Sequence, residues 1–467
     1  MIRISIAPAY VAMMTAIALA GCQSFDGEKV RRQHAQDYPQ ALAEKTAETI
    51  PPEATLGLDD CIRLALQNNL SVRSAEIQAR IATLDRKIAF ANFLPRLDLG
   101  YMHFEFDPAI SIELADSDPM TIEKVRSLTW QANLSIFNPA TWFLYAMHKR
   151  GAEIADLVTD YTRQMTALQV TMAYFQCLSL AETERALASE VAAAVEMEEK
   201  MRDLAGEGLI PSWQADQANV RVQARQVERE RTRRSLRQAK ANLLALLGLS
   251  PLAEITLRAE APLEPPGGSL EDLVAEALLY HPELRIADRN VEIRKEQVKI
   301  ALADFLPKLF GLLYRPEAID EFGAGSIDWV YGLSGTMTIF NGFANINEYK
   351  AAKQRRVESF LQREQATLSV MLEVLRAYLT VTAAQEQVTL AQNAFEVATE
   401  RFKEAEQQWR EGLVGSSELL EVAAGRDRAR AQAIGARFAY QVSTATLLNV
   451  MGKTRIDYEE PVDDSQS

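Results

Sequence analysis

The stretch that decides the fold reads LTWQANLSIF over residues 128–137 and continues as NPATWFLYAMHKRGAEIADLV over residues 138–158. In its first part apolar residues alternate with polar ones, as in a β-strand with one face against apolar surroundings and the other against water. Asn138-Pro139 ends this strand, and no further proline follows until Pro211. The second part begins an apolar stripe that continues to residue 175, and its mean spacing of about 3.5 residues is the coiled-coil period. Its members are Ile154, Leu157, Tyr161, Met165, Leu168, Met172 and Phe175.

The helix predicted from this stripe runs from Ala140 to about Ala205. At ~1.5 Å per residue it would be roughly 100 Å long, which exceeds the diameter of a compact domain made from this chain. A strand that leads directly into such a helix indicates a β-barrel mounted on a coiled-coil shaft.

The same construction occurs twice in the chain. Alternating residues from Trp329 to Phe340 are followed by Asn341-Gly342 and by a second proline-free stretch that lasts until Pro461. Short motifs recur in the same order, and their offset falls from 212 to 203 residues across the predicted acidic loop over residues 107–127. The matched motifs are Phe93-Leu94-Pro95 with Phe305-Leu306-Pro307, Ile136-Phe137-Asn138 with Ile339-Phe340-Asn341, Ala173-Tyr174 with Ala377-Tyr378, and Gly208-Leu209 with Gly412-Leu413. The chain is a duplication.

Each chain offers only four alternating segments, and these cannot close a membrane sheet alone. A sheet in lipid must close into a barrel because unpaired backbone groups are not tolerated there, and closed barrels need about eight strands or more. Strands from several chains must therefore combine, and either two or three chains satisfy this arithmetic. The segments are Leu97–Phe106, Leu128–Phe137, Leu309–Arg315 and Trp329–Phe340.

The first residues are those of an export signal. Arg3 precedes an apolar stretch, and Leu19-Ala20-Gly21-Cys22 resembles a bacterial lipobox. We therefore expect residues 1–21 to be removed and Cys22 to carry acyl chains such as palmitate. Gln23, rather than an aspartate, follows the cysteine, which indicates the outer membrane. Residues 22–55 are polar and proline-containing, and they are predicted to form an extended, lipidated tether.

Taken together and in order, the duplicated Phe-Leu-Pro and Ile-Phe-Asn motifs and the two Gly-Leu turns resemble those of the TolC-like outer membrane efflux proteins, including their lipid-anchored members. The resemblance implies a mainly α fold with membrane β. Three copies of the duplicated strand–long-helix repeat would form a homotrimer, with a twelve-stranded β-barrel on an α-helical coiled-coil tunnel that extends into the periplasm. The repeats are predicted over residues 56–250 and 269–453, with a linker over residues 251–268 and a tail over residues 454–467.

The resemblance also implies a function, that of a passive exit duct in the outer membrane. Its partners would be a periplasmic adaptor (membrane fusion) protein and an inner-membrane pump of the RND type, and the cargo would be small molecules. An outer-membrane duct for type I protein secretion and a non-conducting structural coiled-coil lipoprotein are the alternatives. The four strands argue against the last of these, because a stalk has no use for lipid-compatible strands.

Nothing in the sequence predicts an enzyme, a cofactor or a metal site. Phosphate-loop, nucleophile-elbow and HExxH patterns are missing. The formal net charge of −14 argues against nucleic acid as a partner. Cys61 and Cys177 are expected to be plain helix-packing residues. The histidines stand in unrelated places without partners at ligand spacing, at His34, His103, His148 and His281.

Two turns between the long helices are candidate contact sites. In each turn a glycine can end one helix and a serine can cap the next. The resemblance implies that these turns are the periplasmic tips of the tunnel and meet the adaptor. The tip residues are Gly208, Leu209 and Ser212 in the first half and Gly412, Leu413 and Ser416 in the second.

The resemblance further implies an acidic constriction just after the second tip. Glu421 matches the family's outer acidic position, but Ala424 stands where a second acidic residue is expected. Glu418 lies three residues before Glu421, hence on roughly the same helix face, and could substitute. Three copies of each around an opening would favour cations. The structural alternative is that both glutamates only complement the dipole at the start of the helix.

Overall fold

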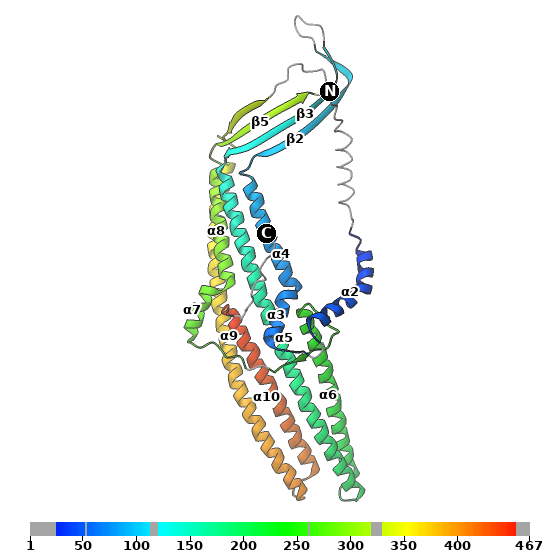
Figure 1. Ribbon diagram of the computed structural model, residues 1–467. Helices are drawn as coiled ribbons and strands as arrows, with labels where there is room; N and C mark the ends of the chain where they lie inside the picture. Colours follow the sequence, from blue (N-terminus) through cyan, green and yellow to red (C-terminus); the bar gives the residue numbers. More distant parts are fainter. Residues whose placement is uncertain (1–24, 52–53, 113–119, 260–261, 319–328, 454–467) are drawn as a thin grey trace.

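The computed structural model describes residues 25–51, 54–112, 120–259, 262–318 and 329–453. A four-stranded sheet lies at one end of an elongated molecule, and two long helical hairpins extend to the other end (Figure 1). Shorter helices flank the long ones about halfway along. The prediction of a mainly helical chain that carries a small sheet is confirmed.

The sheet is antiparallel, with the order β2-β3-β5-β6. Its strands are β2 (Arg96–Ile112), β3 (Met120–Phe137), β5 (Lys308–Ala318) and β6 (Val330–Thr336). The prediction of a loop over residues 107–127 is wrong for residues 107–112 and 120–127, which belong to β2 and β3 and pair as far as Ile112 and Met120. The fourth strand is shorter than predicted, since its pairing ends at Thr336 opposite Lys308, where its partner β5 begins.

Two long helices lead out of the sheet. α5 (Pro139–Gly206) has 68 residues and α9 (Ala344–Arg410) has 67. Each returns as a shorter helix, α6 (Ser212–Leu246) or α10 (Ser416–Val450). α5 starts with a proline, which is tolerated because the first N–H groups of a helix have no intrahelical partner. The predicted long helices and their reversals are confirmed.

Each half adds two shorter helices that pack against its own long helix. These are α3 (Leu58–Asn68) and α4 (Leu70–Ala91) in the first half and α7 (Leu270–Tyr280) and α8 (Pro282–Ala303) in the second. An ion pair joins α4 and α8 to the long helices from equivalent acidic positions, although the two arginines differ by one helical turn. Arg163 of α5 lies 3.0 Å from Glu76 of α4, and Arg363 of α9 lies 2.6 Å from Asp288 of α8. The duplication therefore extends to the packing.

Equivalent positions in the two halves can be paired along whole elements. α4 and α8 correspond at an offset of 212 residues, whereas α5 and α6 correspond to α9 and α10 at 204. The second half gains one residue where Gly342 and Phe343 adopt left-handed φ angles of 68° and 67°, just before α9. Both halves end on a left-handed glycine, Gly248 or Gly452. A Cβ atom at Gly248 would come within 2.5 Å of the Asn68 carbonyl oxygen, so a side chain is excluded there.

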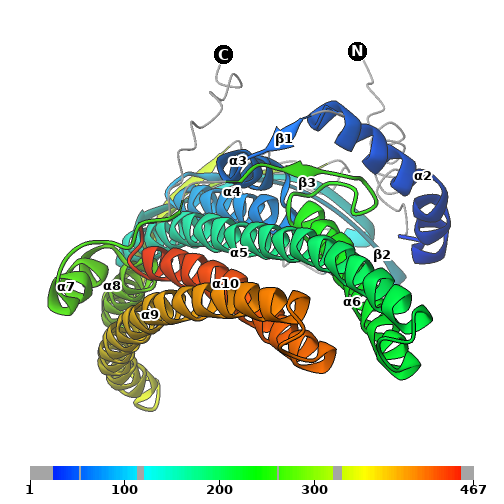
Figure 2. The ribbon, with the colours of Figure 1, turned by 90° about the horizontal axis from the view of Figure 1, so that it is seen from below.

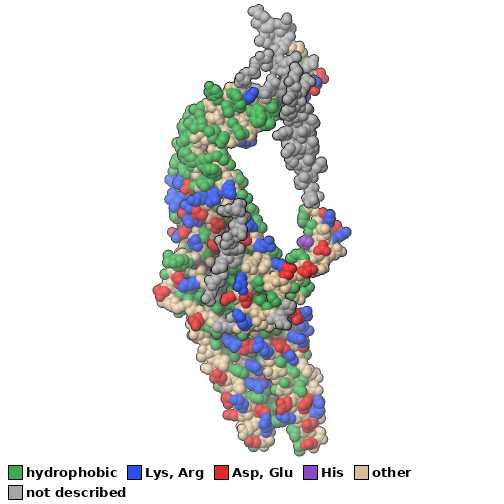
Figure 3. Space-filling model, in the orientation of Figure 1, with side chains coloured by type: hydrophobic (Ala, Val, Ile, Leu, Met, Phe, Trp, Pro, Cys, Tyr) green, Lys and Arg blue, Asp and Glu red, His purple; other side chains and the backbone are tan. Residues whose placement is uncertain are grey.

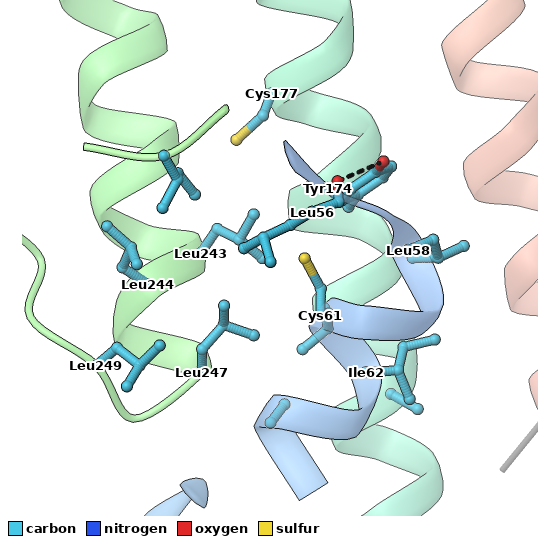
Figure 4. Close-up of a cluster of buried hydrophobic side chains, with 14 of the residues drawn as sticks. Leu56, Leu58, Cys61, Ile62, Tyr174, Cys177, Leu243, Leu244, Leu247 and Leu249 are labelled. Carbon is cyan, nitrogen blue, oxygen red and sulfur yellow. Dashed lines mark hydrogen bonds between the residues drawn. The ribbon is translucent and has the colours of Figure 1, made fainter. Parts of the chain in front are cut away.

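The largest core cluster joins the helices of the first half around Tyr174 (Figure 4). Cys61 and Leu243 are buried in this cluster. The Tyr174 hydroxyl lies within hydrogen-bonding range of the carbonyl oxygens of Leu56, at 3.3 Å, and Arg258. These carbonyls belong to or follow β1 (Thr55–Leu56) and β4 (Thr256–Leu257), which pair in parallel. The predicted linker thus contains a strand that closes the first repeat.

The N-terminal segment departs from the prediction. An extended tether over residues 22–55 is wrong for Gly27–Thr49, which forms helix α2. Pro39 lies inside this helix, which is bent (Figures 1 and 2). Near its end the Thr46 hydroxyl accepts a hydrogen bond of 2.9 Å from the Ser250 N–H. This bond anchors α2 to the end of the first repeat.

Candidate functional site

One face of the sheet is apolar across all four strands. Leu99 of β2 lies opposite Trp130 of β3, and Leu313 of β5 lies opposite Tyr331 of β6. Because side chains two residues apart share a face, the apolar surface extends along the part of the sheet nearer the long helices, and it ends at Arg126 and Arg315, which lie on the same face. Further exposed members are Leu97, Tyr101, Leu134, Ile136 and Leu333. Figure 3 shows apolar side chains covering this end of the molecule, whereas charged side chains spread over the helical end.

The sheet has two open edges in a single chain. Within the described residues β2 pairs only with β3, and β6 pairs only with β5. Backbone N–H and C=O groups along these edges would have no partner in lipid, where water cannot satisfy them. A membrane-embedded sheet of this kind therefore requires strands from other chains.

The tips of the two hairpins lie at the end remote from the sheet (Figure 1) and share one backbone design. Gly208 and Gly412 have φ angles of 76° and 73°, which glycine adopts without strain. The N–H groups of Leu209 and Leu413 donate to carbonyl oxygens of the preceding helical turn at 2.9 and 2.8 Å, as in a Schellman motif. The two leucine side chains are 67% and 70% exposed, so the turns do not need them for packing.

The tip serines differ from the prediction. α6 begins at Ser212 after the cap position Pro211, and α10 begins at Ser416 after Gly415; neither cap position contributes a side-chain hydrogen bond. The prediction of capping serines is therefore wrong. Ser212 is exposed, whereas Ser416 is buried and donates from its hydroxyl to Gln214 Oε1 of α6 at 2.8 Å. Ser416 thus links the two hairpins.

Glu418 and Glu421 are both exposed in the first two turns of α10. Glu421 lines a groove of about 540 Å³ between α9 and α10, which also contains Arg401, Arg426 and Arg428. Three guanidinium groups therefore line the same groove as Glu421, whereas Glu418 is not part of this groove. A ring of either residue requires several copies around one opening, so the acidic constriction stays a prediction.

A buried ionic cluster that the sequence analysis missed joins the two hairpins. Asp427 of α10 is buried, and its carboxylate accepts hydrogen bonds from Arg221 Nη2 of α6 at 3.1 Å and from Arg426 Nη2 at 2.8 Å. Arg225 of α6 lies 3.6 Å from Asp427 and 3.5 Å from Glu190 of α5. These five residues, called the Asp427 cluster below, connect α5, α6 and α10.

Burial governs the protonation of this cluster. Desolvation, followed by the charge of Asp427, raises the pKa of Glu190 above its ordinary value of 4.5. Desolvation likewise lowers the pKa of Arg221, although the neighbouring Asp427 acts against that shift. In this cluster the Asp427 carboxylate balances the positive charge of the arginines. The Glu190 carboxylate, in contrast, loses solvation free energy when it is ionised.

The sequence carries only a weak signal for this cluster. Asp427 stands in the small-residue stretch AAGRDRARA over residues 423–431, and Arg221 and Arg225 are one helical turn apart. An acidic residue among small neighbours is compatible with burial, but charged residues at such spacings are more often solvated on a helix surface. Only the packing of α5, α6 and α10 shows that Asp427 is buried rather than solvated.

Other candidate residues are structural where they are described. The His281 imidazole accepts a hydrogen bond from the Glu283 N–H at 3.3 Å and caps α8, and burial lowers its pKa. Cys61 and Cys177 are buried without a disulfide, as predicted, and burial raises the pKa of the Cys177 thiol to about 11. In the described ranges, no three His, Cys, Asp or Glu side chains converge as a metal site requires. Cys22 lies outside the described residues.

Comparison with known proteins agrees with this geometry. A family model described as "Outer membrane efflux protein" matches residues 61–249 and 273–453. The Campylobacter jejuni CmeC outer membrane channel shares the fold with a TM-score of 0.74 at 17% identity, over 86% of this chain and 87% of that one. CusC gives 0.74 at 15% identity, over 86% and 96%. The open state of the Neisseria gonorrhoeae MtrE outer membrane channel gives 0.70 at 17% identity, over 85% and 89%. No curated protein sequence matches the chain.

Proposed function

Because the chain belongs to the outer membrane efflux protein family, we propose that it forms the passive exit duct of a tripartite efflux machine for small molecules. The observation that carries the proposal is the junction between the sheet and the long helices. The sheet presents a lipid-compatible face, and only Asn138 separates β3 from α5. At ~1.5 Å per residue, α5 then reaches roughly 100 Å from the sheet, far enough to carry a tunnel into the periplasm.

Three copies assemble into a homotrimer in this proposal. Their sheets combine into a twelve-stranded barrel in the outer membrane, so that the open edges of β2 and β6 are paired. Their long helices continue as the wall of the tunnel. The assembly leaves no strand edge exposed to lipid.

The hairpin tips bind a periplasmic adaptor, which connects the duct to an inner-membrane pump of the RND type. The exposed leucines support this step, because Gly208 and Gly412 form the turns and leave Leu209 and Leu413 free for contact. The energy for transport comes from the pump, and the duct itself acts passively.

Acyl chains on Cys22 add a lipid anchor to the outer membrane. Two chains suffice for stable attachment. A Cys22→Ala variant should lose labelling by a palmitate analogue, while its barrel still inserts. A wild-type protein that takes up no label would remove the anchor from the proposal and leave the duct in place.

Conductance in planar bilayers tests the duct. Purified protein should be a trimer by mass measurement and should give discrete, stable conductance steps. A closed resting state of the wild type would also give no conductance. The Asp427→Ala variant is therefore measured beside it, because it removes the shared partner of Arg221 and Arg426 and loosens the contact between the hairpins. Trimers of both proteins that never conduct would contradict the duct and favour a non-conducting stalk.

A further inference from the structure

The apolar surface of the sheet continues beyond its strands. β6 ends at Thr336, and Ile339 and Phe343 after it are 94% and 61% exposed. Aromatic and apolar side chains of this kind mark the level at which a membrane-spanning barrel meets water. The helix ends nearest the sheet, and the turns beside them, add further exposed members, and the whole set is called the apolar boundary below. These members are Phe90, Leu94, Trp142, Leu302, Leu306 and Ile346.

Basic side chains lie next to the apolar boundary on its helical side. Lys295 and Lys299 are exposed in the last turns of α8, and Lys353 and Arg356 are exposed in the third and fourth turns of α9. At ~1.5 Å per residue, Lys299 lies roughly 6 Å from the end of α8, and Lys353 lies roughly 14 Å from the start of α9. Figure 3 shows Lys and Arg side chains gathered over α8, beside the apolar end of the molecule.

Aromatic rings hold these four cations on one surface. Lys295 Nζ and Arg356 Cζ lie 5.9 and 5.6 Å from the centre of the same ring, that of Phe360. Lys299 Nζ lies 5.4 Å from the ring of Phe143 on α5, and Lys353 Nζ lies 5.6 Å from the ring of Tyr349. Because the contacts run from α8 to α5 and to α9, the charges form one patch across three helices.

The first half places basic residues at equivalent positions. With the offsets of 212 and 204 residues, Lys87 of α4 corresponds to Lys299, and Lys149 of α5 corresponds to Lys353. Both lysines are exposed. The six cations, called the basic belt below, thus occur at the same distance from the sheet in both repeats. The belt consists of Lys87, Lys149, Lys295, Lys299, Lys353 and Arg356.

The basic belt is largely uncompensated by the chain itself. Lys299 pairs with Glu296 at 2.7 Å. In the part of the chain that the structure describes, no carboxylate lies within 4.0 Å of the other five belt residues. Exposed cations near the tips differ, because each of these has an acidic neighbour on its own helix, as in Lys200–Glu196 and Lys403–Glu400. Since the formal net charge is −14, composition does not explain an uncompensated belt.

We propose that the basic belt binds phospholipids with anionic headgroups in the membrane leaflet that faces the periplasm. The headgroup phosphate accepts hydrogen bonds from the lysines and the arginine, and the acyl chains lie along the apolar boundary. Basic residues just outside a membrane-embedded segment attract anionic lipids in this way, and each contributes roughly a fivefold change in affinity. A free phosphate ion would use the cations but leave the apolar boundary uncovered. The inference rests on the proposed function only for placing the sheet in the membrane.

Native mass spectrometry tests the lipid site. Delipidated protein in detergent is titrated with phosphatidylglycerol and, separately, with phosphatidylcholine of the same acyl chains. Phosphatidylglycerol should bind at least about fivefold more tightly, and added salt should reduce this preference through screening. Neutralising four belt residues should weaken phosphatidylglycerol binding at least about tenfold and leave phosphatidylcholine binding unchanged. That variant is Lys295→Gln/Lys299→Gln/Lys353→Gln/Arg356→Gln.

Two matched variants separate the belt from folding and from total charge. Replacing the three lysines by arginine, as Lys295→Arg/Lys299→Arg/Lys353→Arg, keeps the charge and should keep the affinity for phosphatidylglycerol. Removing the same number of exposed cations near the tips should also leave this affinity unchanged. That control is Lys200→Gln/Arg202→Gln/Lys403→Gln/Arg410→Gln.

Three results would overturn the inference. Equal binding of the two lipids would show that the headgroup charge is not recognised, and an equal loss in the tip control would show that only total charge matters. Binding of sn-glycerol 1-phosphate as tight as that of the lipid would assign the belt to free anions. The belt is complete in one chain, so a monomer that still prefers phosphatidylglycerol would contradict the trimer of the proposed function and leave the lipid site in place.

Discussion

The Asp427 carboxylate accepts hydrogen bonds from Arg221 and Arg426, and almost none of it reaches solvent. Removing one member of a buried ion pair costs about 3–5 kcal/mol, because the opposite charge is left uncompensated. Asp427→Ala should therefore loosen α10 from α6 by roughly 3 kcal/mol. We expect faster limited proteolysis near the tips and a higher open probability in bilayers. Asp216→Ala, which removes an exposed carboxylate of α6, should change neither.

Glu190 gives the same cluster a pH dependence. Its pKa is raised by burial, so the folded protein holds this proton more tightly than the unfolded chain does. Its contribution to stability is present below pH 4.5 and is lost as the pH rises through the raised pKa. Glu190→Gln, which stays neutral, should melt at a higher temperature than the wild type at pH 7.5, and the difference should vanish near pH 4.5. A lower melting temperature at pH 7.5 would mean that attraction to Arg225 outweighs desolvation.

Residue-level roles are predictable from the sequence only where they depend on the backbone. Gly208 and Gly412 could be assigned because a left-handed turn needs glycine. Ser212 and Ser416 are equivalent in sequence, yet one is exposed and the other binds Gln214, since their surroundings come from different helices. The Asp427 cluster escapes prediction for the same reason, because its members come from α5, α6 and α10.

At the scale of elements, variants of the hairpin tips distinguish an effect on folding from an effect on contact with the adaptor. Replacing Leu209 or Leu413 by aspartate changes an exposed side chain next to an intact glycine turn, which should alter stability by less than about 0.5 kcal/mol. Export should nevertheless fall, because the aspartate places a charge where the adaptor is expected to pack. Susceptibility of cells to exported compounds, measured beside trimer yield, gives the readout. Gln217→Asp, an exposed change further along α6, is the control. A parallel loss of trimer would return the leucines to a folding role.

The ends of the long helices are predictable because their signals are local. Asn138-Pro139 starts α5 and Gly208 follows its end, whatever packs nearby. The sequence did not predict α2 because Pro39 was taken to exclude a helix. Asp26 nevertheless caps this helix, and a proline inside a helix can bend it without ending it. The length of β2 is missed because its pairing resumes at Ile110 after a register shift, and strand pairing depends on the partner more than on alternation.

For the whole molecule, the sequence predicts that one chain is incomplete but leaves the number of copies open. Four strands cannot close a barrel, but two chains would supply eight strands and three would supply twelve, and either number is sufficient. The structure agrees with this prediction. Within the described residues the outer edges of β2 and β6 are unpaired, and apolar side chains of α9 such as Leu361 and Leu379 are exposed. The ring size depends on the angle at which the helix faces pack, and that angle arises from side-chain contacts between copies that no local pattern encodes.

Assembly also decides the role of Glu418 and Glu421. Three carboxylates about 10 Å from a permeating ion change its energy by ~1 kcal/mol in water, roughly a fivefold change in relative permeability. Glu421 shares its groove with Arg401, Arg426 and Arg428, which reduce its field, whereas Glu418 is outside that groove. Glu418→Gln should therefore lower cation selectivity in bilayers more than Glu421→Gln does, and the double variant should lower it most. Glu411→Gln, an exposed carboxylate just before the second tip, is the control. Unchanged selectivity in the double variant would leave both glutamates with the role of complementing the dipole of α10.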